Sequence, residues 1–88
     1  MAILHPDVEQ AIHDADPSDD RRADVMLATR GILEPKQRLA IESIDGNVHT
    51  VAGDVVTVDL PVRSLAALGE LEFVKYVELS SPLWLEEK

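Results

Sequence analysis

The side chains best suited to catalysis or metal binding in this 88-residue chain are three histidines, His5, His13 and His49. None of them belongs to an HExxH metal motif or to the Ser, His and Asp pattern of a nucleophilic triad. We predict that His5 caps a helix, that His13 lies on that helix and that His49 lies on an edge strand. Each is expected to be an ordinary surface residue, so the sequence predicts no catalytic residue and no enzyme.

An acidic run near the start of the chain is the second candidate for metal chemistry. Its oxygen-bearing side chains alternate in the spacing that opens a calcium-binding EF-hand loop, at Asp14, Asp16, Ser18 and Asp20. The rest of that loop does not match, because Asp19 stands where Gly is needed and Val25 where a bidentate Glu is needed. We therefore predict a solvated linker, with no metal and no other cofactor.

Composition narrows the class of partner. The net charge is −9 and the chain has no cysteine, so it lacks the clustered Lys and Arg that bind nucleic acid or an anionic membrane, and it has no disulfide. The first residues contain neither a basic segment nor a long apolar run, so we expect no signal peptide and no transmembrane helix. The expected location is the cytoplasm, or the extracellular space if the chain is excised from a secreted precursor.

The spacing of apolar residues predicts three helices and four strands. The helices are expected over residues 5–15, from Pro35 to a left-handed Gly46, and around Leu65 and Leu68. The strands are expected over residues 25–29, 48–51, 55–60 and 73–79, and a two-residue turn at Gly53-Asp54 joins the middle two.

After the N-terminal helix, this order is strand, helix, strand, strand, helix, strand. It predicts an α+β domain of the ferredoxin-like βαββαβ type, with a four-stranded antiparallel sheet and two helices on one face. Right-handed crossovers are expected to bring the first and third strands together in parallel. We expect three parts: an N-terminal helix with an acidic linker (1–22), the ferredoxin-like module (23–80) and a C-terminal tail (81–88).

Strand alternation predicts which side chains face away from the helices. Val56, Val58 and Leu60 should point toward the helices, and the intervening residues should point outward. The outward set is expected to be Val55, Thr57 and Asp59, joined by Tyr76 and Glu78. This face is either a docking surface or a solvated sheet face, which antiparallel sheets commonly have.

The tail carries Leu83, Trp84 and Leu85 close together, and such an apolar cluster needs cover. Either Trp84 folds back on the core or pairs with another copy of the chain, or the tail enters the groove of a partner.

Two segments, VAGDVVTVDLP and LAALGELEFVKYVELSSPL, carry a wider resemblance. Together with the helix and charged linker before them, they resemble the prodomains of subtilisin-like serine proteases. The catalytic motifs of those proteases are absent from the chain. The resemblance implies an inhibitor and chaperone module whose outer sheet face, including Val55, Thr57 and Tyr76, packs on two parallel surface helices of the protease.

The resemblance also implies roles for the end of the chain. Glu78 would cap the N-termini of the protease helices, and Ser80 stands where family members often have a second acid. The tail would lie in the substrate cleft as a product does, with Lys88 in the first subsite and Leu85 in the fourth, beside Leu83 and Trp84.

The expected function is therefore inhibition of a subtilisin-like protease, in cis or in trans, together with assistance to its folding. The alternative is a non-inhibitory interaction or regulatory domain, in which the same face or the edge strands form a homodimer or dock a non-protease partner.

Overall fold

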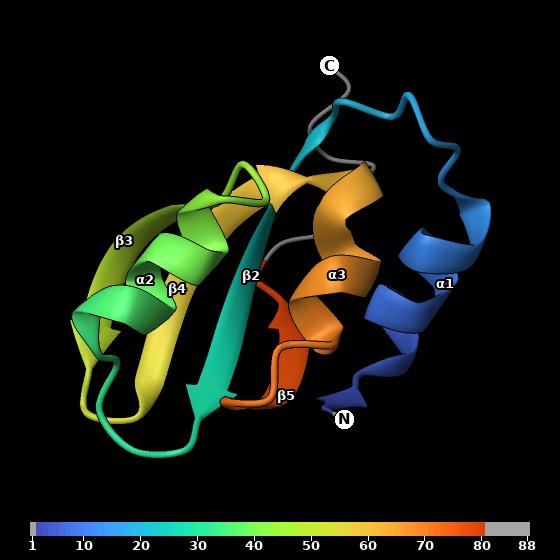
Figure 1. Ribbon diagram of the computed structural model, residues 1–88. Helices are drawn as coiled ribbons and strands as arrows, with labels where there is room; N and C mark the ends of the chain where they lie inside the picture. Colours follow the sequence, from blue (N-terminus) through green and yellow to red (C-terminus); the bar gives the residue numbers. More distant parts are fainter. Residues whose placement is uncertain (1, 81–88) are drawn as a thin grey trace.

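The computed structural model describes residues 2–80, which form an α+β fold (Figure 1). Its elements, in chain order, are β1 (Ile3–Leu4), α1 (Pro6–Asp14), β2 (Arg22–Thr29), α2 (Pro35–Glu42), β3 (Asn47–Ala52), β4 (Val55–Pro61), the 3₁₀ helix η1 (Val62–Ser64), α3 (Leu65–Gly69) and β5 (Val74–Leu79).

The strands form one mixed sheet with the order β1-β5-β2-β4-β3. Only the β1–β5 pair is parallel, and the other neighbours are antiparallel. The prediction of four strands was wrong, because Ile3–Leu4 adds a fifth beside Tyr76 and Val77. The prediction that the first and third strands pair in parallel was also wrong. The first and third predicted strands correspond to β2 and β4, and these pair antiparallel. β4 lies between β2 and β3 and runs antiparallel to both, so β2 and β3 are parallel to each other but are not neighbours in the sheet.

Two turns contain a left-handed residue: one connects β3 to β4, and the other follows α2. The predicted two-residue turn is confirmed, since Gly53 and Asp54 connect β3 to β4 and Gly53 has a φ of 63°. The left-handed residue after α2 is Asp45, with a φ of 69°, and not Gly46 as predicted. Gly46 is required for a different reason, because a Cβ there would lie 2.6 Å from Cγ2 of Ile41.

The helices begin with the caps that their sequences favour. His5 is the N-cap of α1, where its Nδ1 accepts the Asp7 N–H at 3.1 Å, and Pro6 follows it. Pro35 opens α2, as predicted, and Gln37 closes a capping box by accepting the Glu34 N–H at 2.9 Å.

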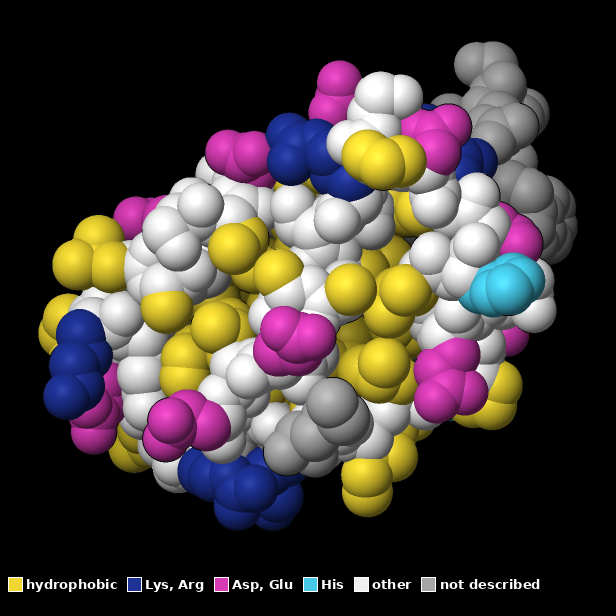
Figure 2. All heavy atoms as spheres, turned by 45° about the vertical axis from the view of Figure 1, so that its right-hand side comes forward, with side chains coloured by type: hydrophobic (Ala, Val, Ile, Leu, Met, Phe, Trp, Pro, Cys, Tyr) yellow, Lys and Arg dark blue, Asp and Glu magenta, His cyan; other side chains and the backbone are white. Residues whose placement is uncertain are grey.

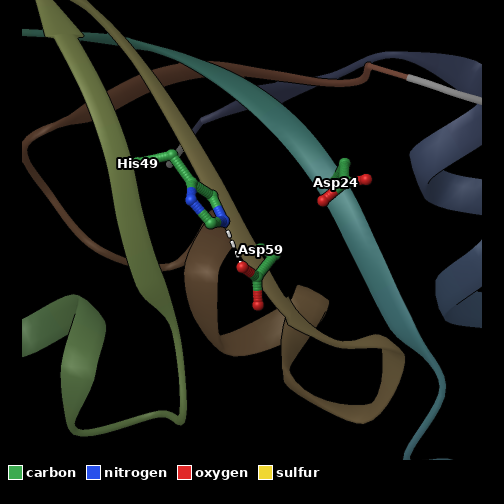
Figure 3. A group of neighbouring side chains, drawn as sticks. All are labelled: Asp24, His49 and Asp59. Carbon is green, nitrogen blue, oxygen red and sulfur yellow. Dashed lines mark hydrogen bonds and ion pairs between the residues drawn. The ribbon is translucent and has the colours of Figure 1, made fainter.

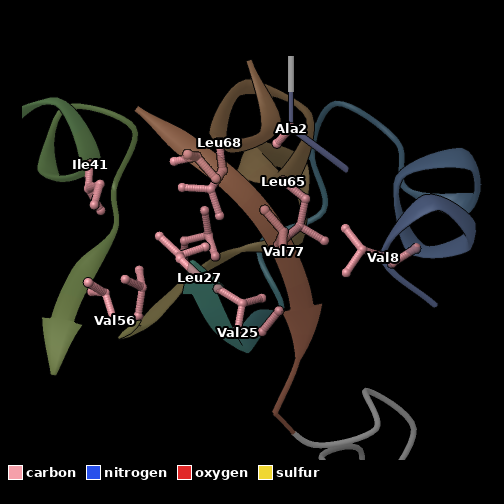
Figure 4. Packing of buried hydrophobic residues seen from close by; sticks show 14 of the residues in the cluster. Ala2, Val8, Val25, Leu27, Ile41, Val56, Leu65, Leu68 and Val77 are labelled. Carbon is pink, nitrogen blue, oxygen red and sulfur yellow. The ribbon is translucent and has the colours of Figure 1, made fainter. Parts of the chain in front are cut away.

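All of the described helices lie on one side of the sheet. In Figure 1, α2 and α3 lie in front of the strands and α1 lies beside α3. The core fills the space between helices and sheet (Figure 4), and its apolar members are Ala2, Val8, Ala11, Ala23, Val25, Leu27, Ile41, Val56, Val58, Leu60, Val62, Leu65, Leu68, Val74 and Val77. Val8 and Ala11 of α1 belong to this core, so the N-terminal helix packs on the same hydrophobic cluster as α2 and α3.

The side of the molecule that carries α1 has a mixed surface. Figure 2 shows hydrophobic side chains in the middle of this view, with acidic and basic groups around and between them. Leu4, Ile12 and Ala15 are partly buried and pack against the core. None of the helices within residues 2–80 has the length and apolar character needed to cross a bilayer.

Candidate functional site: the outer face of the sheet

Alternation along β4 places its side chains on two faces, as the sequence predicts. Val56, Val58 and Leu60 are buried under the helices. Val55, Thr57 and Asp59 point the other way, and Val55 is 37% exposed. The described helices leave this second face uncovered, and we call it the outer face.

Strand register identifies the other members of the outer face. Met26 of β2 pairs with Thr57 on one side and with Glu78 on the other, so all three side chains lie on the same face. Tyr76 pairs with Ala28, two residues along β2 from Met26, and so lies on this face too. The predicted positions of Tyr76 and Glu78 on the same face as Thr57 are therefore confirmed. The outer face comprises Ile3, Arg22, Asp24, Met26, Ala28, Asn47, His49, Thr50, Ala52, Val55, Thr57, Asp59, Tyr76 and Glu78.

Sequence reasoning missed the contribution of β2 to this face. Met26 and Ala28 lie at its centre, between β4 and β5. Part of the signal was present in the sequence, because charged Arg22 and Asp24 alternate with apolar Ala23 and Val25. In the structure, this alternation between exposed or half-buried and buried positions continues through residue 29. The predicted strand began at residue 25, three residues after the start of β2, and so left out the first part of that alternation.

The outer face has a charged end built around Asp59. The Arg22 guanidinium binds Oδ1 of Asp59, with Nε at 2.9 Å, and Asn47 Nδ2 donates to the same oxygen at 3.2 Å. The Nε2 of His49 contacts the other oxygen, Oδ2. Partial burial alone would raise the pKa of Asp59, but the hydrogen bonds from Arg22, His49 and Asn47 and the charge of Arg22 outweigh burial and lower the pKa below its usual value.

Asp24 stands next to this group on β2. It is exposed, and it is the direct cross-strand partner of Asp59. On its other side, the Ser80 N–H donates to the Asp24 carbonyl at 2.7 Å, which makes Ser80 its neighbour beyond the end of β5. Figure 3 shows Asp24, His49 and Asp59 on three adjacent strands.

Glu78 and Tyr76 form a second polar pair on β5. Loss of hydration, followed by the hydrogen bond and the negative charge of Glu78, raises the pKa of the Tyr76 phenol. Both side chains are half-buried, and Ser80 is exposed. The remaining predicted contact residues, Leu83, Trp84, Leu85 and Lys88, lie outside the described residues.

The other sequence candidates have local roles. His13 is exposed on α1, as predicted. In the acidic run, Asp16 Oδ1 accepts both the N–H and the hydroxyl of Ser18, and Asp19 binds Arg21. Asp20 binds Arg63 on η1 at 2.8 Å.

A polar groove of about 670 Å³ lies beside the charged end, and Arg22 and Arg63 both line it. Arg63 bridges Asp20 at 2.8 Å and Asp45 at 2.9 Å, while Arg22 is bound by Asp59. Both guanidinium groups already contact carboxylates, and these ion pairs connect neighbouring segments of the chain. The groove therefore has little positive charge left to bind an anion.

The outer face is therefore the part of the described chain with the most distinctive arrangement. It combines an uncovered centre of small and apolar side chains with a cluster of carboxylates at one end. No protein-family model, no curated protein and no solved structure matches the chain.

Proposed function

We propose that this chain binds and inhibits a subtilisin-like serine protease, with the outer face docked on the protease and the C-terminal tail in its substrate cleft. The same docking would assist folding of the protease. The observation that carries the proposal is the outer face itself. It is one side of the sheet, and all the described helices lie on the other side.

The topology supports a ferredoxin-like module as the framework of this inhibitor. The strand order β5-β2-β4-β3, with antiparallel neighbours and helices after β2 and β4, is the order of a split βαβ fold. In this proposal β1 and α1 are additions to the module, which extend the sheet beyond β5 and the helical layer beyond α3.

The chemistry of the outer face suits two helices of a partner. Its centre has the short side chains of Ala28 and Thr57 and the flexible side chain of Met26, over which helices can pack closely. A helix N-terminus has unpaired N–H groups and partial positive charge, which a carboxylate can bind. Glu78 is in place to supply one such carboxylate.

Asp24 is proposed to supply the second carboxylate. The prodomain resemblance leaves Ser80 at a position where an acid is common, but Asp24 is the cross-strand neighbour of Ser80 and is exposed. The acidic end of the face then includes Asp24 and Glu78 on adjacent strands. The net charge of −9 favours a partner with positive potential at this contact.

Inhibition kinetics test the docking surface. The full chain should inhibit hydrolysis of a peptide substrate by subtilisin competitively. Thr57→Arg places a long charged side chain at the centre of the outer face, and should raise the inhibition constant at least about tenfold, equivalent to about 1.4 kcal/mol.

Ala66→Arg is the matched control, because Ala66 is exposed on α3, on the helical side. Its inhibition constant should equal that of the wild type, and both variants should keep the wild-type circular dichroism. Absence of inhibition by the wild type, or equal effects of the two variants, would reject the outer face as the docking surface.

A truncation tests the tail separately. Removing residues 85–88 should weaken inhibition, while binding to a protease whose active site is blocked should stay unchanged, because that binding uses the sheet. An inhibition constant equal to that of the full chain would refute insertion of the tail in the cleft.

The alternative, a homodimer or another docked partner, is favoured by one observation. β3 is at the edge of the sheet, so its backbone has a strand on one side only, and Val51 on this strand is 43% exposed. Such an edge can pair with a second chain. Light scattering distinguishes the two functions, since a tight dimer that does not inhibit the protease supports the alternative.

A further inference from the structure

Asp24, His49 and Asp59 converge on the outer face from three adjacent strands, β2, β3 and β4 (Figure 3). One ligating atom from each side chain can be chosen so that all three lie within 4.8 Å of one another. The geometry points to a binding site for a divalent transition metal ion of the zinc type, held by the His49 Nε2 and by one carboxylate oxygen from each aspartate.

The donor set selects the class of metal. The imidazole nitrogen favours Zn²⁺ and neighbouring transition metals, which also accept carboxylate oxygens, whereas Ca²⁺ and Mg²⁺ prefer sites made of oxygen alone. Three protein ligands leave at least one coordination position of the metal ion open. Since none of the helices within residues 2–80 covers these three side chains, that position is accessible from outside the described domain, where water or a partner's side chain can occupy it.

The two aspartates gain the most from a cation. Asp24 and Asp59 are directly opposite each other on neighbouring antiparallel strands, and like charges in such pairs repel. The Arg22 guanidinium offsets part of this repulsion by binding Oδ1 of Asp59. Asp24 keeps its exposed carboxylate, so a metal ion between the two strands would neutralise the charge that Arg22 leaves.

The surroundings orient the ligands as an outer coordination shell does. Arg22 and Asn47 both bind Oδ1 of Asp59, which leaves Oδ2 directed at His49. Such contacts fix a ligand and raise metal affinity. Because Asp59 keeps these partners through its other oxygen, a metal ion on Oδ2 requires no loss of the Arg22 ion pair.

An irregularity in β3 aims His49 at the same point. The register shifts between Val48 and Thr50, so His49 is an extra residue in the strand opposite β4. A bulge of this kind redirects a side chain, and bulges are common beside functional sites. Here His49 faces outward with Thr50 and reaches Asp59.

Titration of the full chain with Zn²⁺ alone tests the site. Calorimetry should give one site per chain, and the His49 imidazole signals in NMR spectra should shift on binding. His49→Gln and Asp24→Asn should each weaken Zn²⁺ binding by about 10- to 100-fold or more, the scale seen for residues that shape metal sites. Mg²⁺ should not shift the His49 signals.

His13→Gln is the matched control, because His13 is an exposed histidine on α1, far in the sequence from the cluster. It should bind Zn²⁺ as the wild type does. Failure of Zn²⁺ to bind, or equal binding by His49→Gln, would overturn the site. Weakening in only one of the His49 and Asp24 variants would overturn the assignment of three ligands. No protease is present, so a negative result would leave the proposed inhibition untouched.

Discussion

Replacing Val8 with Ala should destabilise the whole domain and not only the N-terminal helix. Val8 is on α1 and has 0% of its surface exposed. α1 packs on β5, α3 and η1, and β1 anchors the chain before it to β5. The substitution therefore opens a cavity inside the core that the sheet shares with all three helices.

The expected loss follows from burial. The change removes two buried carbon atoms, each contributing about 0.8 kcal/mol, and the unfilled cavity adds to this loss. Alanine returns about 0.5 kcal/mol through its higher helix propensity. The net loss should be about 2 kcal/mol, a large share of the roughly 4 to 13 kcal/mol expected for a domain of this size. The melting temperature should fall by about 10 °C.

Urea denaturation followed by circular dichroism measures this loss, and Leu39→Ala is the control. Leu39 is on α2 with 63% of its surface exposed, so its replacement should change the free energy of unfolding by less than about 0.5 kcal/mol. If α1 were a separable appendage, Val8→Ala would leave the unfolding midpoint and the amide exchange of Leu27 in β2 unchanged. That result would refute a shared core.

Two further predictions concern ionisable groups of the outer face. Asp59 has a lowered pKa in the folded state, so the stability that its carboxylate contributes is fully present above its unfolded pKa, about 3.9, and is lost as the pH falls through the folded value. Asp59→Asn should reduce the free energy of unfolding at neutral pH and should flatten its decline below about pH 4. Urea midpoints measured across that range test this, and parallel declines in the variant and the wild type would contradict a lowered pKa of Asp59. Tyr76 is the only tyrosine, so phenolate absorbance reports its titration directly. The phenol should ionise above its usual pKa, and Glu78→Gln should bring the pKa closer to that value; an identical titration in the variant would show that Glu78 has no effect.

Local signals in the sequence were enough to predict most elements. Pro35 at the start of α2, the Gly53-Asp54 turn and the alternation of Val56 and Val58 with Thr57 are each determined by a few adjacent residues. These signals depend on backbone preferences and on the period of two in a strand, so they need no knowledge of distant contacts. The outward direction of Thr57 followed from the same alternation.

Features that depend on distant pairing were not predictable in this way. β1 has two residues, too few for a periodic pattern, and it forms only because Val77 and Tyr76 lie beside it. The left-handed residue after α2 is Asp45, whereas Gly46 is needed because Ile41 leaves no room for a side chain there, a packing constraint that residue type alone does not reveal. The meeting of Asp24 with Asp59 and His49 likewise depends on the β2–β4 register and on the irregularity in β3.

The parallel pair of β1 and β5 has a consequence for biosynthesis. β1 and β5 come from opposite ends of the described chain, and β2, the other neighbour of β5, also lies far before β5 in the sequence. On the ribosome, β2 is made early and has an unpaired edge until β5 emerges. Sheets whose strands are distant in sequence also fold slowly, so Val25 and Leu27 lack the cover of β5 until that strand has been made. Cellular chaperones that hold apolar segments are thus expected to meet this chain before β5 is complete.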